Sequence, residues 1–569
     1  MTLTWSVTLV PLLPLLTAIL VVAGGPGSQR RRAMLGVWPV VAAFAGSLLA
    51  LGLVAIQGPV HIGLYESGAV TALAFPVGFH IDRLSAIMMT LITAVSAIIY
   101  LYSMRYMQQD RGFARFLSLL TLTDFVLLCM VSSANLLMLF VFWQLLSWLL
   151  YLLSHNRTHQ ATLDGAFKTF TLLRAADMAF LMGIVLAHAL YGTVEFQELF
   201  ARAAAAPVVL SPLPGIEIGG ATAVTLLIFV GAMGKSAQFP MHLWLPGSLY
   251  APTPVHAMLH AGIINAGGFL LNRLAPLYGL SPATLHVVFV VGMVTAVLGA
   301  SMMLVQNDIK KTLGYSTIGQ MGYMIMECGL GAFALAVFHL VAHGLFKATV
   351  FLNCGNVIHK VRQEPSSPHP EHVAEEPELS RLTWTTGFLT TLLLPMVILL
   401  VTHGVLRIPL LESQGTVIFL FFIWVTSSQA ILTLTRLRAV ASWKVSAAML
   451  LTLLFVVFTY LFAAEAFTHF LYPDRREAAF YFQAAALPGR LFDGLVVGTT
   501  LLIILGWVYL YAQAHGRTMP IPAWVQALRV RFYVLFMNRL YVDVLHARLG
   551  QWMMRAAHGL DKRSIGRLW

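Results

Sequence analysis

The 569-residue sequence has few charged residues and very few cysteines. Lys, Arg, Asp and Glu make up 10% of it, whereas hydrophobic residues make up 59%. A water-soluble protein of this size needs far more polar surface, so the composition excludes a soluble globule. The three cysteines, Cys129, Cys328 and Cys354, lie inside apolar runs without C-x-x-C spacing. This arrangement excludes a disulfide framework, a zinc finger and a cysteine-ligated iron–sulfur cluster in this chain.

The sequence also lacks the usual signatures of nucleotide and redox chemistry. It contains no P-loop, no Rossmann glycine fingerprint and no haem or flavin motif. We therefore expect no cofactor in this chain and no enzymatic activity of its own. The energy for any process that it carries out must come from an ion gradient or from a partner.

Long apolar runs are the most abundant feature of the chain. A spanning helix needs about 20 apolar residues, so these runs predict an all-α polytopic membrane protein with about 15 transmembrane helices. The first run precedes the basic triplet Arg30–Arg32, whereas a secretory signal carries its charge before the apolar stretch, and we interpret this run as a retained helix. The expected spans are 5–23, 34–56, 81–104, 113–132, 134–153, 162–191, 221–248, 253–275, 283–305, 312–331, 332–358, 383–410, 415–437, 442–467 and 491–514.

Lysine and arginine are unevenly divided between alternate loops. Loops after odd-numbered spans, together with the C-terminal tail, hold 24 of the 35 basic residues, and seven lie on or beside the even loops. The positive-inside rule then places the N-terminus outside and the C-terminus in the cytoplasm. The rule also accounts for the net charge of +12 without a nucleic-acid partner, and we expect membrane lipids as the surroundings.

Composition divides the chain into five parts. These are two N-terminal helices with an outer loop (1–80), a core (81–359), a proline-rich acidic cytoplasmic linker (360–382), further spanning helices (383–514) and a cytoplasmic tail (515–569). Within the tail, residues 523–560 mix arginine with aromatic and aliphatic residues, which predicts an amphipathic helix on the inner membrane surface or on a partner.

The segment 231–262 concentrates glycine and proline in an apolar region and reads GAMGKSAQFPMHLWLPGSLYAPTPVHAMLHAG. Such a density predicts a helix that is broken at membrane depth, which the bilayer tolerates only where the freed backbone groups line a cavity. Lys235 lies just before the break. A nearby carboxylate favours its ammonium form and burial disfavours that form, so its proton can be switched. We interpret Lys235 as a proton carrier; the alternative is a snorkelling or structurally paired lysine.

Histidines recur at helical spacing in two places. His256 and His260 are four residues apart, as are His339 and His343, and Lys347 follows four residues later. This spacing puts titratable side chains on one helix face and predicts a hydrated proton relay. A metal site is the weaker alternative, because H-x-x-x-H needs a third protein ligand and no acid or cysteine stands at suitable spacing. Satisfied core histidines are the other alternative.

The span 162–191 carries two pairs of opposite charge. Asp164 and Lys168 are four residues apart, and Arg174 and Asp177 are three apart. Each spacing supports an ion pair within the helix, which lowers the cost of burying the charges. A structural role and a role on the ion path both remain open for these residues.

Asp124 and Glu327 lie inside spans without a basic partner nearby in sequence. Their partners must come from other helices, unless they stay protonated, and they are candidates to pair with Lys235 or Lys347. Since Asp177 is expected to be held by Arg174, we expect Asp124 to supply part of the counter-charge for Lys235; the alternative is a protonated or hydrogen-bonded structural acid in a helix interface.

These motifs resemble the proton-conducting antiporter-like subunits shared by respiratory complex I and Mrp-type cation/proton antiporters. The resemblance covers about residues 78–360, and it implies inverted repeats with broken helices and a place in the bacterial inner membrane. The motifs that carry it are FHIDRLSAIMM (79–89), YLYSMRYM (100–107), FKTFTLLRAAD (167–177), GKSAQFPMHLWLP (234–246), QNDIKKTLGYSTIGQMGYM (306–324) and FHLVAHGLFKATVFL (338–352).

Several departures narrow the resemblance. Where the family has an acid after tryptophan, this chain has Trp143 and Gln144, and the family's later lysine-containing element is missing. With the variant HAGIINAGGFLLNRLAP (260–276), the chain is most similar to the membrane subunit of the DAB inorganic-carbon accumulation complex. That resemblance implies a subunit that conducts protons or sodium and couples the gradient to carbon dioxide hydration. The hydration chemistry would belong to a cytoplasmic, zinc-containing, carbonic-anhydrase-like partner.

Three other functions stay open. The chain could be a proton-pumping subunit of a complex I-like NADH dehydrogenase. The absence of the family's later lysine-containing element argues against this function. It could be a subunit of a Mrp-type antiporter, or a membrane scaffold with a closed channel, an alternative that Gln144 keeps open. What co-purifies with the chain distinguishes these functions.

Overall fold

The computed structural model describes residues 9–23, 29–65, 77–155, 160–248, 251–363, 465–514 and 523–548, and single positions at 451, 458, 462–463, 551–552 and 555. The expected linker beyond residue 363, two of the expected spans (383–410 and 415–437) and most of a third (442–467) lie outside the described residues. The total number of spans and the sidedness of the termini therefore stay predictions.

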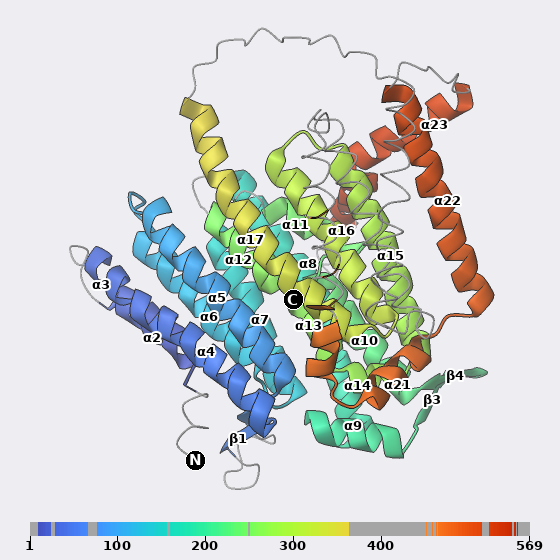
Figure 1. The fold of residues 1–569 in the computed structure, drawn as a ribbon, viewed down its shortest axis with the longest axis horizontal. Helices are drawn as coiled ribbons and strands as arrows, with labels where there is room; N and C mark the ends of the chain where they lie inside the picture. Colours follow the sequence, from blue (N-terminus) through green and yellow to red (C-terminus); the bar gives the residue numbers. More distant parts are fainter. Residues whose placement is uncertain are drawn as a thin grey trace, which may run out of the picture.

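The described part of the chain is almost entirely helical (Figure 1). Eight of the described helices are long and apolar enough to cross a membrane, and the long helices agree with the expected spans within a few residues. The helices of the first half are α2 (Leu12–Val22), α3 (Gln29–Leu35), α4 (Val37–Gln57), α5 (Arg83–Tyr106), α6 (Phe113–Val131), α7 (Leu136–Ser154), α8 (Gln160–Tyr191) and α10 (Gly220–Lys235). Those that follow are α12 (Thr253–Ala261), α13 (Ala266–Arg273), α15 (Pro282–Leu304), α16 (Ile309–Gly329), α17 (Phe333–Gln363), α22 (Gly489–Ala514) and α23 (Ala523–Met537).

Side-chain caps explain where three of the core helices begin. Asp82, Asn135 and Asp308 have extended backbones and accept hydrogen bonds from the backbone N–H three residues later, at 2.8, 2.8 and 2.9 Å. Such caps satisfy amide groups that the first turn of a helix leaves free. They begin α5, α7 and α16, and so position the residues that follow.

The strands and the short helices α9, α14 and α21 lie at one end of the helical bundle, along its lower edge in Figure 1, whereas α23 and the end of α17 lie at the opposite end. In the expected order of spans, all the elements at the lower edge follow even-numbered spans, as alternate membrane crossings require. The four strands among them form two antiparallel hairpins, with Val60 opposite Ile81 in one and Val209 opposite Gly219 in the other. The elements are β1 (Val60–Tyr65), β2 (Val77–Ile81), α9 (Phe196–Ala205), β3 (Val209–Leu213), β4 (Ile216–Gly219), α14 (Ala275–Gly279) and α21 (Arg475–Ala485).

The helix break expected after Lys235 is confirmed. The helix α10 ends at that lysine, and the chain continues through the short helices η2 (Met241–Leu243) and α11 (Trp244–Gly247) before α12 begins. The expected span 253–275 is also broken, which the sequence analysis did not predict. A 3-10 turn, η4 (Ile263–Asn265), separates α12 from α13 at Gly262. Leu127 of α6 packs so close to Gly262 that a side chain there would collide with it.

Close packing of α8 and α10 sets the distance between their functional side chains. Gly231 and Gly234 of α10 face Phe180 and Ala176 of α8, and a side chain at either glycine would collide with its neighbour. Small residues let membrane helices approach until their backbones are nearly in contact. The C-terminal end of α10, and Lys235 with it, therefore lies beside the turn of α8 that carries Asp177.

Candidate functional site

Lys235 is fully buried at the end of α10. Its Nζ donates hydrogen bonds to the Trp143 backbone oxygen at 3.0 Å and to Ser147 Oγ at 2.6 Å, both on α7, and lies 4.8 Å from the centre of the Trp143 ring. The C-terminal end of a helix carries partial negative charge, which stabilises a cation there. The lysine is thus held at the helix break by two hydrogen bonds to α7 and by the end of its own helix.

Asp177 is linked to this lysine through Trp143. Its oxygens accept a hydrogen bond from Trp143 Nε1 at 2.6 Å and pair with Arg174 Nη2 at 2.7 Å, so the expected ion pair within α8 is confirmed. The charges of Asp177 and Arg174 both act on Lys235. Trp143 therefore joins the lysine to the carboxylate: its carbonyl accepts from one and its indole donates to the other.

Asp124 lies inside the expected span 113–132. It is buried on α6, and one of its oxygens accepts a hydrogen bond from Ser96 Oγ of α5 at 2.5 Å. Within the described residues, Asp177 rather than Asp124 is the acid whose charge acts on Lys235. The neighbouring Gln144 is only half-buried. That Asp124 supplies part of the counter-charge for Lys235 stays a prediction, and the link through Trp143 favours Asp177 for that role.

The two predicted histidine sets come together because α12 packs against α17. His260 stacks on Phe351 with ring centres 4.3 Å apart and planes 8° apart, and His256 bonds the Ala251 carbonyl oxygen at 3.0 Å. The charges of His343 and Lys347 act on His260. Residues about ninety positions apart in the chain thus form one buried, titratable cluster.

His339 connects α17 to α16. Its Nδ1 lies 3.1 Å from Glu327 Oε2 and its Nε2 lies 2.8 Å from Gln320 Oε1, and its ring centre is 6.3 Å from that of His343. Lys347 donates to Ser316 Oγ at 2.8 Å. Glu327 was a candidate to pair with Lys235 or Lys347. It pairs with His339 instead, because the two helices place them opposite each other.

Both ring nitrogens of His260 and of His343 lack hydrogen-bond partners among the described residues. Buried polar groups in proteins almost always bond to protein or to ordered water, so these rings need water to complete their bonding. Ser236 Oγ donates to the Ile264 carbonyl oxygen at 2.7 Å, which ties the residue after Lys235 to the turn after His260. A single hydrated relay from Lys235 to Lys347 stays a prediction. Within the described ranges, no three His, Cys, Asp or Glu side chains are grouped as metal ligands.

The expected pairing of Lys168 with Asp164 stays a prediction. The Asp164 side chain lies outside the described residues, and Lys168 Nζ contacts the carboxylate of Asp543, far along the chain, which also accepts from Arg539 Nη1 at 3.0 Å. No spacing rule connects residues that are 375 positions apart. Only the folded chain could reveal this contact.

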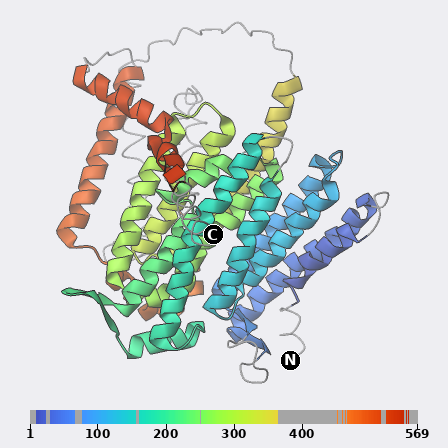
Figure 2. The ribbon, with the colours of Figure 1, turned by 180° about the vertical axis from the view of Figure 1, so that it is seen from behind.

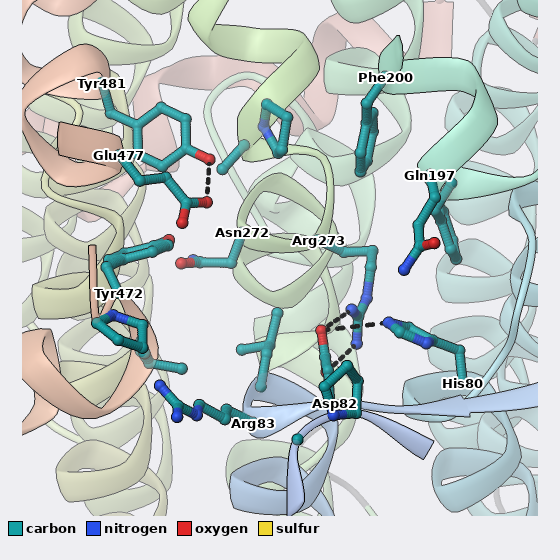
Figure 3. Close-up of a pocket in the computed structure, with 18 residues that line it drawn as sticks. His80, Asp82, Arg83, Gln197, Phe200, Asn272, Arg273, Tyr472, Glu477 and Tyr481 are labelled. Carbon is teal, nitrogen blue, oxygen red and sulfur yellow. Dashed lines mark hydrogen bonds and ion pairs between the residues drawn. The ribbon is translucent and has the colours of Figure 1, made fainter. Parts of the chain in front are cut away.

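A second polar site, which the sequence analysis missed, lies at the end of the bundle where the even-numbered loops gather (Figure 3). It is a cavity of about 470 Å³. On one wall Arg273 bonds both oxygens of Asp82, at 2.5 and 3.1 Å, and His80 Nε2 lies 3.6 Å from the same carboxylate. Burial opposes the ionisation of Asp82, but the charge and hydrogen bonds of Arg273, together with the nearby His80, outweigh it, so the pKa of Asp82 lies well below its usual value.

The chain combines broken helices with lysines and histidines that are buried between packed helices. These features are typical of one class of protein, the polytopic membrane subunits of the antiporter type. Residues 133–428 match the family described as NADH:quinone oxidoreductase/Mrp antiporter, TM, and residues 69–117 match the N-terminus of complex I chain 5. The chain belongs to this antiporter family, as an ion-conducting type of membrane subunit.

Individual relatives differ in how much of the chain they match. The chain is 39% identical over 557 residues to the probable inorganic carbon transporter subunit DabB1 of Halothiobacillus neapolitanus, covering 96% of this chain and 97% of that one. It is 36% identical over 324 residues to NADH-quinone oxidoreductase subunit L of Neisseria meningitidis, covering 56% and 48%. The chain thus spans about half the length of the latter relative.

Solved structures confirm the fold. The chain superposes on a chain of the Mrp complex from Dietzia sp. DQ12-45-1b with a TM-score of 0.58 and 23% identity, covering 99% of this chain and 60% of that one. On a chain of respiratory complex I from Thermus thermophilus the TM-score is 0.54 at 18% identity, with coverage of 84% and 99%. The antiporter-like architecture expected from the motifs is therefore correct.

Proposed function

We propose that this chain is the ion-conducting subunit of an inorganic-carbon transporter in the bacterial inner membrane. Protons, or sodium ions, would move through it down their gradient and drive a cytoplasmic, zinc-containing, carbonic-anhydrase-like partner to accumulate bicarbonate from carbon dioxide. The observation that carries the proposal is the match to a probable inorganic carbon transporter subunit over 96% of this chain and 97% of that protein.

Lys235 is the central carrier in this proposal. An ionisable group inside the bilayer costs several kcal/mol unless it is paired, so a buried lysine responds strongly to a carboxylate beside it. Asp177 supplies that carboxylate, and Arg174 and Trp143 hold it in place. Movement of Asp177 towards Arg174 or towards Lys235 would release or bind the lysine's proton.

The histidine cluster extends the path across the bundle. His260, His343 and Lys347 form its middle, and His339 with Glu327 forms a branch towards α16. Imidazoles both accept and donate protons near neutral pH, which suits them to a relay through water. Asp124 and Lys168 flank the path on α6 and α8.

The energy available from such a path is sufficient for accumulation. One elementary charge that crosses 100 mV releases about 2.3 kcal/mol. Since about 1.4 kcal/mol corresponds to a tenfold ratio, one proton per turnover supports roughly a fiftyfold gradient of bicarbonate. A subunit that only moves ions can therefore drive a partner that only hydrates carbon dioxide.

The test uses a host strain that lacks carbonic anhydrase and grows only in elevated carbon dioxide. Co-expression of this chain with its zinc partner should restore growth in air and accumulation of labelled bicarbonate, and a protonophore or sodium ionophore should abolish both. The Lys235→Ala variant should assemble with the partner but fail to accumulate. Accumulation that survives the collapse of both gradients would contradict the proposal.

A second candidate function is ion pumping in a complex I-like NADH dehydrogenase or in a Mrp-type cation/proton antiporter. The observation in its favour is 36% identity to an NADH-quinone oxidoreductase subunit over 324 residues. Purification of the tagged chain distinguishes the candidates, because a zinc protein, a quinone-reducing assembly and small antiporter subunits are mutually exclusive partners.

A further inference from the structure

The segment after α23 returns to the core. It passes through η7 (Arg539–Tyr541) and a further helical stretch to residue 548, and Figure 2 shows this red segment lying against the green and teal helices. Asp543 in this segment contacts Lys168 Nζ of α8 through one oxygen and Arg539 Nη1 through the other, at 3.0 Å. The tail is thereby tied to the helix that also carries Asp177.

Two buried groups of the core lie behind this contact. His242 of η2 and Tyr315 of α16 are fully buried, and within the described residues neither the two ring nitrogens of His242 nor the Tyr315 hydroxyl has a hydrogen-bond partner. Lys168, Asp543, Arg539 and His546 lie close enough to His242 to act on it electrostatically, as Arg539 and Asp543 do on Tyr315. We call these six residues the inner cluster.

The inner cluster includes partly exposed side chains and a buried one in the helix break. The side chains of Lys168 and Asp543 are 32% and 31% exposed, whereas His242 is not exposed at all. His242 follows Lys235 by seven residues, within the break itself. The cluster lies near the starts of α8 and α16, at the end of the bundle that the charge count assigns to the cytoplasm.

The backbone that delivers Asp543 is strained. Arg539, Leu540 and Tyr541 have φ values of 54°, 58° and 56°, in the left-handed region that residues with side chains rarely adopt. Strained conformations persist when surrounding contacts impose them, and they concentrate at functional sites. Here the strain reverses the chain after α23 and sets Asp543 against Lys168.

We propose that Asp543 of the tail, with Lys168 and His242, forms the site where protons pass between cytoplasmic water and the broken helix. This inference rests on the proposed ion-conducting function. A proton from water binds the Asp543 carboxylate, moves to a ring nitrogen of His242 and leaves Asp543 as a carboxylate again, and the imidazolium passes the proton on along the break. Lys168 and Arg539 hold the carboxylate in place, and His546 and Tyr315 complete the surroundings of the transfer.

The test measures proton uptake into proteoliposomes that contain the whole complex, under an imposed membrane potential. Asp543→Asn should lower the rate by about a hundredfold, the lower range for a positioned acid or base, and Asp543→Glu should restore most of it. Asp493→Asn, at an exposed position of α22 outside the cluster, is the matched control and should conduct normally.

A purely structural ion pair makes a different prediction. The double variant Lys168→Gln/Asp543→Asn removes both charges and keeps a hydrogen-bonding pair, so a structural pair would leave conduction intact, whereas a loading site would lose it while partner co-purification stays normal. Wild-type conduction by this double variant, or by Asp543→Asn alone, would overturn the inference. If the wild-type complex itself conducted no ions, the proposed function would fail instead.

Discussion

Replacement of Lys235 by arginine separates a proton carrier from a fixed charge. Arginine can donate the same two hydrogen bonds, to the Trp143 carbonyl oxygen and to Ser147 Oγ, and can keep its charge beside Asp177. What it cannot do is release its proton at an accessible pH. Lys235→Arg should therefore assemble normally and fail to transport.

The expected magnitude follows from the chemistry of the two side chains. Ordinary pKa values of about 10.4 for lysine and at least 12.5 for arginine imply a deprotonated fraction that is about a hundredfold smaller. The site is fully buried, so the larger guanidinium also adds a packing cost of about 1–3 kcal/mol. This cost lowers the melting temperature without unfolding the protein, and transport should fall by about two orders of magnitude or more.

The assay compares bicarbonate accumulation and proton uptake for Lys235→Arg, Lys235→Ala and the control Lys311→Arg, which changes a lysine outside the buried site. Each variant is first checked for co-purification of the partner and for its melting temperature. Lys235→Ala and Lys235→Arg should both be inactive, and Lys311→Arg should be active. Transport by Lys235→Arg at the wild-type rate would refute the carrier role of Lys235.

Three other predictions test the remaining parts of the site. Asp177→Asn should lower ion flux by more than tenfold, whereas Asp124→Asn should reduce it only a few-fold. A larger loss of flux in Asp124→Asn than in Asp177→Asn would assign the counter-charge of Lys235 to Asp124. His260→Gln should slow flux several-fold without abolishing it, since water can bypass one member of a relay; complete loss would show an obligatory carrier. Asp82→Asn should destabilise the protein at pH 7 by about 3 kcal/mol through loss of the Arg273 pair. Since the folded pKa of Asp82 is depressed, this stability is present above about pH 4 and is lost as the pH falls through the folded value, so melting curves of variant and wild type should converge in acid.

The sequence alone determined the features that depend on neighbours along the chain. Run length predicted the spans, because a helix that crosses a bilayer must satisfy its backbone within itself and needs a fixed number of apolar residues. The density of glycine and proline predicted the break after Lys235. The three-residue spacing of Arg174 and Asp177 predicted their ion pair, since residues three apart share a helix face.

The tertiary structure decided which groups meet across helices. Trp143 links Lys235 to Asp177, Glu327 lies against His339, and Lys168 contacts Asp543 from the tail. Each of these contacts depends on the rotation and tilt of one helix against another. Those angles follow from packing between small residues and from the turns at broken helices, so sequence spacing carries no information about them. The sequence thus identified most of the charged groups that the site uses, and only packing could assign each of them its partner.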